Sequence, residues 1–174
     1  MSKYRYGYKS LKLSDIDPAT KLAKAGTEKE LKEDVYRDSF DIVEEEGATT
    51  DHFSEMDPDP KISFSETGKT NITLQIMDTS VDTLALLKGG EVVVDVNQNR
   101  VWSKPKESVQ KEKYVELETQ DGYKIVVPRG KVVARYNNQV RRNGIALLDV
   151  TITPLTPELE DLSAMDIIEP APAV

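Results

Sequence analysis

Apolar and polar residues alternate along most of this chain, and the alternation predicts β-strands. In Asn71–Met77, the apolar residues Ile72, Leu74 and Ile76 are separated by polar ones. A period of two places the two sets on opposite faces of a strand, so one face is expected to be buried. Ile145–Thr153 repeats the pattern. The same criteria predict further strands at Tyr4–Leu13 (a strand, or an arm that adds to a sheet edge), Val35–Glu46, Lys61–Glu66, Glu91–Val96, Val101-Trp102, Val109–Thr119, Tyr123–Val127 and Lys131–Asn137.

One segment, Asp78–Gly90, predicts a short helix instead of a strand. Val81, Leu84 and Ala85 recur at positions i, i+3 and i+4, so they form one apolar face. Ser80, or the threonine before it, is suited to cap the first backbone N–H groups. The two glycines at the end stop the helix, because glycine accepts the left-handed conformation. A helix of about nine residues is too short to be stable alone, so we expect it to lie against the strands.

Turn signals divide the strands. Asp121-Gly122 and Asn143-Gly144 are strong hairpin turns, and Thr67-Gly68-Lys69 predicts another. Pro128-Arg129-Gly130 is expected to separate two strands, and Gly47–Pro60 to form a turn-rich loop. Around nine short strands with one helix predict a mainly β fold. We expect two packed antiparallel sheets, as a sandwich or barrel, flanked by one short α-helix and carrying extended arms or loops.

Length and composition limit the domain organisation and the chemistry. A chain of 174 residues predicts one domain, here divided into an N-terminal arm (residues 1–26), a β-sandwich (27–157) and an acidic, mobile C-terminal tail (158–174). The absence of cysteine excludes disulfides, thiolate metal sites and cysteine nucleophiles. Neither a signal peptide nor an apolar run long enough to cross a bilayer is apparent. The expected location is therefore a cytoplasm-like compartment.

Charge is distributed unevenly along the chain. The formal net charge of −8 argues against sequence-independent binding to nucleic-acid phosphates. Glu28–Asp59 holds 13 acidic and 3 basic residues, whereas Lys104–Arg142 holds 10 basic and 5 acidic ones. Two interpretations are open. The surface is simply uneven and solvated, or an acidic region of one copy meets a basic region of an identical neighbour.

The candidate chemical groups are few. His52 is the one histidine, and no nucleophile-elbow motif accompanies it; the hypothesis of a hydrolase that uses this histidine is therefore weak. Asp51, Glu55, Asp57 and Asp59 loosely resemble a set of oxygen ligands for calcium, but prolines interrupt them and no glycine supplies the sharp turn. A charged loop that avoids self-association accounts for them better. We expect no catalytic, metal or cofactor site.

The aromatic residues predict packing and assembly more than ligand binding. Trp102 is the single tryptophan, and we expect it to pack in the core or on a sheet face. Tyr4, Tyr6 and Tyr8 alternate near the N-terminus of an acidic chain. This pattern favours addition of a strand to a neighbouring molecule over stacking on bases or sugars.

The order of several segments resembles the major tail protein (tail tube protein) of tailed bacteriophages. The resemblance covers about Val35–Leu155. It rests on Val35–Pro60, Lys61–Glu66, Asn71–Met77 leading into the helix, the helix exit Leu87-Lys88-Gly89-Gly90, Trp102 after the next hairpin, Val127-Pro128-Arg129-Gly130-Lys131-Val132, and Gly144-Ile145-Ala146-Leu147-Leu148-Asp149-Val150. Inner-tube proteins of contractile injection systems share the general fold that this resemblance implies.

The resemblance implies a structural virion protein that self-assembles into hexameric rings. The rings stack into a tail tube that conducts DNA during ejection, and an acidic lumen would keep DNA from adhering. The implied partners are further copies of the chain and the tape measure, tail terminator and baseplate or tail-tip proteins; the implied location is the virion tail, assembled in the host bacterial cytoplasm. The candidate inter-subunit contacts are Tyr4, Tyr6, Tyr8, Asp51, His52, Phe53, Glu55, Asp57 and Asp59. The alternative function is a carbohydrate-binding-like β-sandwich module, with Trp102 and tyrosines as an exposed platform.

Overall fold

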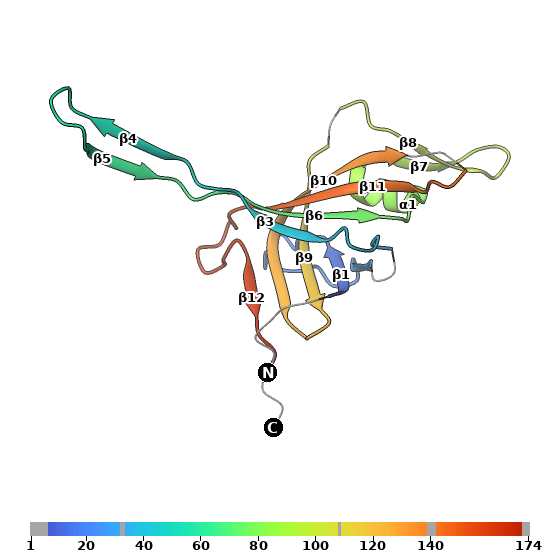
Figure 1. Ribbon diagram of the computed structural model, residues 1–174. Helices are drawn as coiled ribbons and strands as arrows, with labels where there is room; N and C mark the ends of the chain where they lie inside the picture. The colour runs from blue at the N-terminus through green and yellow to red at the C-terminus, as the bar shows by residue number, and fades with distance from the viewer. Residues whose placement is uncertain (1–6, 32–33, 108, 139–141, 172–174) are drawn as a thin grey trace.

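The protein has the predicted mainly β fold with one short helix (Figure 1). The computed structural model describes residues 7–31, 34–107, 109–138 and 142–171. Strands account for 49% of the residues and helix for 5%. The prediction of antiparallel sheets, packed in a sandwich-like manner and flanked by one helix, is confirmed.

The largest sheet has eight strands. Seven follow in the order β2 (Lys29–Glu30), β1 (Tyr8–Ser14), β9 (Lys111–Thr119), β10 (Lys124–Asn138), β11 (Ala146–Pro154), β6 (Thr70–Ile76) and β3 (Asp41–Glu44). The eighth, β12 (Asp166–Ile168), pairs with β10. All these pairs are antiparallel. The turn predicted at Asp121-Gly122 connects β9 to β10, with Gly122 at φ 88°.

Two hairpins and the helix lie outside this sheet. The hairpins are β4 (Thr49–Phe53) with β5 (Pro60–Ser65), and β7 (Glu91–Val94) with β8 (Arg100–Ser103). The helix α1 (Val81–Lys88) precedes β7 and contacts β7, β8 and β10. Figure 1 shows α1 and the β7–β8 hairpin at one end of the molecule, with the β4–β5 hairpin extending from the other.

The long strand β10 joins the two halves of the large sheet. Its first part pairs with β9 and β12, and its second part with β9 and β11. The predicted strand break at Pro128-Arg129-Gly130 is wrong, because the strand continues through it with a register shift against β9 between Val127 and Gly130. A proline gives no backbone donor and is accommodated at such a bulge. A Cβ on Gly130 would lie 3.0 Å from Ile152, so glycine lets the sheet curve tightly here.

The alternating apolar residues fill one core. Leu11 of β1, Leu117 of β9, Ile76 of β6 and Leu148 of β11 are each at most 1% exposed and belong to a single hydrophobic cluster. Because side chains of period two share a face, the cluster covers one side of the curved sheet, and α1 closes it. The alternation in the sequence therefore identified the core strands β6 and β11 correctly. The half-buried strand predicted over Val35–Glu46 is wrong in extent and burial, because only Asp41–Glu44 forms a strand there and all four residues are exposed.

The caps of α1 are as predicted, but its buried face is not. The Ser80 side chain accepts a hydrogen bond from the Thr83 backbone N–H at 3.4 Å. The predicted apolar face of Val81, Leu84 and Ala85 is only half correct: the buried residues are Thr83, Leu84 and Leu87. The Thr83 hydroxyl donates to an aspartate side chain that precedes the helix. This bond satisfies a buried polar group and turns that face of the helix toward the core.

Both terminal segments contribute strands to the body. Within the predicted N-terminal arm, Tyr8–Ser14 lies in the large sheet between β2 and β9, with Leu11 and Leu13 buried. Within the predicted mobile tail, Asp166–Ile168 pairs with β10. These parts of the arm and the tail are corrected accordingly. The sequence missed β2, β4 and β12 because each is short and mostly polar or lies in a turn-rich segment.

Candidate assembly interface

The β4–β5 hairpin projects from the body as an arm (Figure 1). We call residues 49–65 the hairpin arm, and residues 45–48 and 66–69 its neck. The predicted turn-rich loop Gly47–Pro60 is therefore wrong over Thr49–Phe53, which forms β4. The predicted hairpin turn Thr67-Gly68-Lys69 is also wrong: it belongs to the neck, because β5 pairs with β4 and not with β6. The turn of the hairpin lies between Phe53 and Pro60.

Two glycines let the backbones approach closely in the neck. A Cβ on Gly68 would lie 1.6 Å from the Glu45 carbonyl oxygen, and one on Gly47 would lie 1.9 Å from that of Glu66. Two backbone hydrogen bonds connect the same segments: the Glu45 N–H donates to the Lys69 carbonyl at 2.9 Å, and the Glu66 N–H donates to Ala48 at 2.8 Å. The neck therefore holds the arm to the edge of the large sheet through these backbone contacts, and the Asn71 side-chain amide of β6 adds a hydrogen bond to the Glu45 carboxylate at 2.8 Å.

Every residue of β4 and β5 is exposed, including large apolar ones. Ile62 and Phe64 are 54% and 58% exposed, and Phe53 is 60% exposed. Met56, in the turn, is 97% exposed. A two-stranded hairpin without a packing partner is marginally stable in water, and a group of exposed apolar side chains marks an interaction surface. The arm is thus a surface that gains stability when another molecule covers it.

The two faces of the arm differ in chemistry. The directly opposed pairs Thr50–Phe64 and His52–Ile62 share one face, and the His52 ring meets the Phe64 ring edge-on at 5.9 Å. The opposite face is more polar: the Ser63 hydroxyl donates to the Asp51 carboxylate at 2.5 Å, although Phe53 follows Asp51 there at the strand period of two. A more apolar face and a more polar one are typical of a hairpin that lies on a partner.

The predicted contact residues of this region are brought together on the arm. Asp57 forms an ion pair with Lys61, and this hydrogen bond lowers the pKa of the Asp57 carboxyl. The side chains of Glu55 and Asp59 have no hydrogen-bond or ion-pair partner among the described residues. Nor do the described residues hold any group of three or more His, Asp or Glu that could bind a metal ion. The carboxylates therefore make the tip acidic without converging on one point.

The predicted tyrosine contacts are not part of the arm. Tyr8 is half-buried in the body, where its hydroxyl donates to the Leu31 carbonyl and its ring lies 5.8 Å from the Phe40 ring. Burial raises the pKa of the Tyr8 hydroxyl. Tyr8 thus packs in the body, away from the arm, while Tyr4 and Tyr6 lie outside the described residues. Sequence reasoning also missed Met56, Ile62 and Phe64 as arm residues, although their apolar character in an acidic segment was a usable signal.

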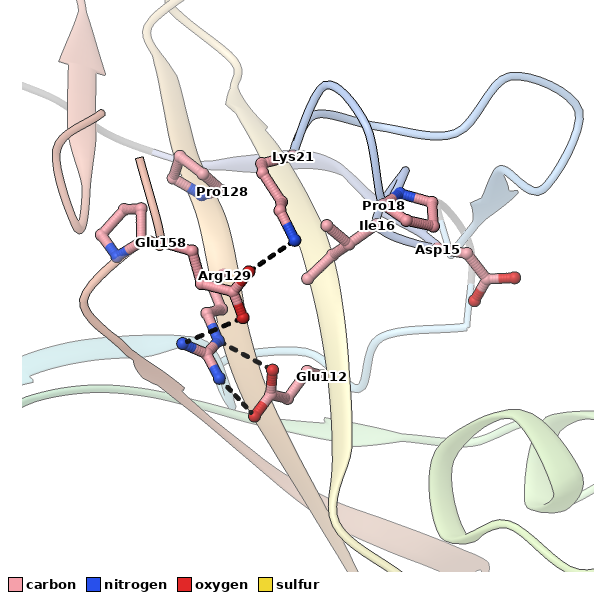
Figure 2. A pocket seen from close by; sticks show the side chains of 9 residues that line it. Asp15, Ile16, Pro18, Lys21, Glu112, Pro128, Arg129 and Glu158 are labelled. Atoms are coloured by element: carbon pink, nitrogen blue, oxygen red, sulfur yellow. Dashed lines mark hydrogen bonds and ion pairs between the residues drawn. The ribbon is translucent and has the colours of Figure 1, made fainter. Parts of the chain in front are cut away.

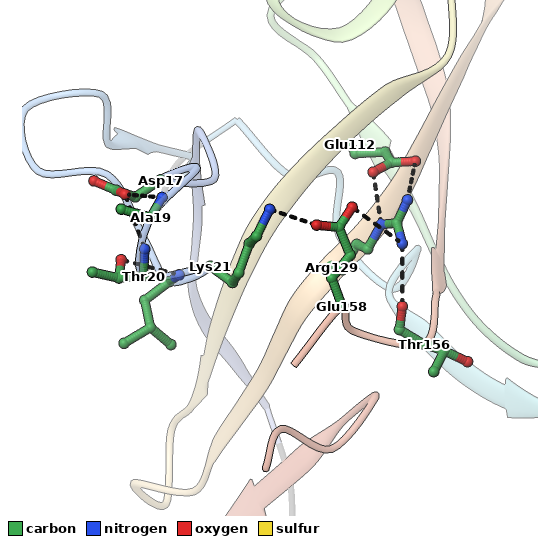
Figure 3. Close-up of polar contacts among 9 residues, drawn as sticks. Asp17, Ala19, Thr20, Lys21, Glu112, Arg129, Thr156 and Glu158 are labelled. Carbon is green, nitrogen blue, oxygen red and sulfur yellow. Dashed lines mark hydrogen bonds and ion pairs between the residues drawn. The ribbon is translucent and has the colours of Figure 1, made fainter. Parts of the chain in front are cut away.

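A second region, a cavity beside the bulge of β10, contains several charged groups (Figure 2). Arg129 binds Glu112 with two hydrogen bonds, Nε to Oε2 at 2.8 Å and Nη2 to Oε1 at 3.2 Å. Its Nη1 donates to the Thr156 carbonyl at 3.3 Å. Lys21 pairs with Glu158 at 2.5 Å, and Glu158 lies 4.0 Å from Arg129 (Figure 3).

These ion pairs connect segments that are far apart in the sequence. The hydrogen bond from Arg129 lowers the pKa of the Glu112 carboxyl, and that from Lys21 lowers the pKa of Glu158. Each carboxylate is stabilised in its charged form by a cation already in place. The ion pairs that line the cavity therefore hold the N-terminal loop and the segment after β11 on the sheet, and the charged groups neutralise one another.

Trp102 packs against the core, as predicted. Its indole N–H donates to the Gly89 carbonyl at 2.9 Å, and its ring meets the Tyr136 ring edge-on at 6.3 Å. The residue is half-buried against the hydrophobic cluster. The arrangement gives the indole a fixed structural partner and does not present it as a flat platform for a sugar.

No protein-family model matches the chain, and no curated protein matches it. No helix in the described part of the chain has the length and apolar character to cross a membrane. The hairpin arm is therefore identified as the candidate site from its exposure, its two-faced chemistry and its position.

Proposed function

We propose that this protein is the tail tube subunit of a tailed bacteriophage, a structural protein that self-assembles into stacked hexameric rings. The hairpin arm carries the proposal. It extends from a well-packed β body, exposes all residues of both strands, and its strands pair with each other and with no other described strand. An arm of this kind is stabilised by a neighbouring copy and contributes little to the subunit that bears it.

Open sheet edges support self-assembly as well. Ile42 and Val43 of the edge strand β3 are exposed, as are Ile167 and Ile168 of β12. Unpaired edges with apolar side chains are templates for association and are usually protected. A closed ring of identical subunits pairs every edge and leaves none free.

The proposal extends to the partners and the location. Stacked rings would enclose a channel for DNA, and the net charge of −8 favours passage of DNA without adhesion. Further copies of the chain are the main partners. The tape measure, tail terminator and baseplate or tail-tip proteins would contact the ends and interior of the tube in the virion tail. The function requires neither catalysis nor a cofactor.

Negative-stain electron microscopy over a concentration series tests the proposal. We expect rings or hollow tubes from the wild-type protein and from Val94→Asp, which changes an exposed valine on β7. The double variant Ile62→Asp/Phe64→Asp places the same kind of charge on the apolar face of the arm and is expected to stay monomeric. A wild-type protein that remains monomeric at every concentration would contradict the proposal and turn attention to a glycan-binding screen.

A further inference from the structure

A groove lined by lysines lies at the end of the molecule that carries α1. It occupies about 480 Å³ between the end of α1, the segment after β8 and the second half of β10. Lys88, Lys104, Lys106 and Lys131 line it, and Glu107 is the one carboxylate among the lining residues. We call this feature the lysine groove. It concentrates positive charge on a protein whose net charge is −8.

Most of this positive charge has no internal partner. Within the described residues, the ammonium groups of Lys104, Lys106 and Lys131 form no ion pair or hydrogen bond. Lys88 differs, because its Nζ donates to the Ala134 carbonyl at 3.0 Å and lies 5.0 Å from the centre of the Tyr136 ring. Burial and, secondarily, the charge of Lys104 lower the pKa of Lys88. An anionic group bound in the groove would reduce the repulsion between these lysines. The groove thus favours an anionic occupant.

The occupant must also offer apolar surface, because the groove contains exposed valines. Val109 and Val133 line the groove and are 45% and 38% exposed. The tip of the hairpin arm has the complementary combination: Glu55 and Asp59 carry unpaired carboxylates, while Met56 between them is almost fully exposed. The lysine groove and the tip of the arm are therefore complementary in charge and in apolar surface, and both are uncovered.

The positions of the two surfaces decide how they can meet. In Figure 1 the arm leaves the body on the side away from α1 and the β7–β8 hairpin, whereas the lysine groove lies beside α1. The arm of one chain cannot fold back onto its own groove. A contact between different patches on identical molecules is heterologous, and its repetition produces a closed ring or an open stack.

We propose that the acidic tip of the hairpin arm of one copy docks into the lysine groove of the next copy. This inference rests on the proposed function for its self-assembly and specifies which surface receives the arm. The lysines neutralise the carboxylates of the tip, Met56 covers the exposed valines, and like charges elsewhere on the acidic surface disfavour other docking positions.

Disulfide trapping tests the contact directly, because the wild-type chain has no cysteine. A Met56→Cys chain is mixed with an isotopically labelled Gln110→Cys chain, which keeps all four lysines. The control partner is Ala25→Cys, an exposed position away from the groove. We expect the mixed disulfide with Gln110→Cys to form at least about tenfold faster than with Ala25→Cys, because docking raises the effective concentration of the thiols. Equal rates for the two partners would overturn the inference.

Charge exchange gives an independent test in the cysteine-free chain. Glu55→Lys/Asp59→Lys reverses the charge of these two positions on the arm, and Lys104→Glu/Lys106→Glu reverses the charge of these two positions in the groove. Each double variant is expected to lose assembly, and the chain with all four changes to regain it. Glu160→Lys/Asp161→Lys changes the charge equally on exposed residues elsewhere and is expected to assemble normally. If the four-fold variant fails while the control assembles, the charge pairing is refuted.

The outcomes separate this inference from the proposed function. Tubes of wild-type protein without preferential trapping would leave the tube function in place and reject this docking site. Preferential trapping in a protein that never forms rings or tubes would support the docking site and contradict the tube function. A third measurement uses double-stranded DNA as the probe: if DNA binds the wild-type protein, is released by Lys104→Glu/Lys106→Glu, and trapping shows no preference, the groove serves phosphates and the inference is wrong.

Discussion

Gly68 provides a sharp test of how the arm is attached, because its missing side chain allows the neck to form. In Gly68→Ala the new Cβ would lie 1.6 Å from the Glu45 carbonyl oxygen, whereas ordinary contact begins at 3.4 Å. The two backbones must therefore separate by about 1.8 Å. The hydrogen bond from the Glu45 N–H to the Lys69 carbonyl, now 2.9 Å, would then exceed hydrogen-bonding distance. The bond between Glu66 and Ala48 lies in the same short neck and would be strained with it.

The expected cost follows from these two bonds. A backbone hydrogen bond contributes about 1 kcal/mol net, so losing both costs about 2 kcal/mol. The loss is local, because no residue of β4 or β5 is buried in the core. We expect the body to unfold at an unchanged denaturant concentration. The ratio of held to released arms, however, would fall about 30-fold, so that the concentration needed for assembly rises by up to about 30-fold.

Two assays follow this change. Limited proteolysis measures attachment of the arm independently of assembly, and Gly68→Ala is expected to be cleaved in the neck much faster than the wild type. Sedimentation over a concentration series measures the assembly threshold. Thr67→Ala, at an exposed neighbouring position, is the matched control and should behave as the wild type in both assays. The reasoning would be refuted if Gly68→Ala were cleaved at the wild-type rate, or if this variant lost the whole fold cooperatively.

Two further predictions concern the body. The hydrogen bond from Arg129 holds the folded pKa of Glu112 below its usual value of 4.5, so this pair stabilises the fold above that pH and its contribution is lost as the pH falls through the folded pKa. In urea unfolding, Glu112→Gln should therefore be less stable than the wild type at neutral pH, by a difference that shrinks toward acid pH; a constant difference would contradict this. Leu148→Ala removes a fully buried side chain and should cost about 2 to 5 kcal/mol, whereas Val94→Ala at an exposed position should change stability by less than about 0.5 kcal/mol. Similar losses in both variants would contradict the assignment of the core.

The predictions from the sequence were most accurate where one local rule was sufficient. The alternation in β6 and β11 identified the buried residues correctly, because the side-chain period of a strand is local. Ser80 and Gly89 end α1 as expected, because caps depend on adjacent backbone groups. The buried face of α1 was only half correct: Leu84 is buried as predicted, but Thr83 is held inward by a hydrogen bond that hydrophobicity alone does not reveal.

The candidate site was predicted in part. Residues 51–59 were recognised as an acidic segment suited to contacts between subunits, and they lie on the arm. The arm itself was missed because its two Asp-Pro pairs, and the glycine before them, indicated a loop, while β4 is stabilised by pairing with β5 across the turn. The contacts of Tyr8 with Leu31 and Phe40 were not predicted, because they come from distant segments; its contact with a second subunit stays a prediction.

By itself, the sequence determined the fold class, the core positions and the helix ends, because hydrophobic period, turn chemistry and capping act over a few residues. Only the tertiary structure decided the order of the strands in the large sheet, that β10 continues through Pro128, and that an arm leaves the body. It also decided that Lys88, Lys104 and Lys131 line one groove. These features depend on backbones and charges brought together from distant parts of the chain, so no local pattern specifies them.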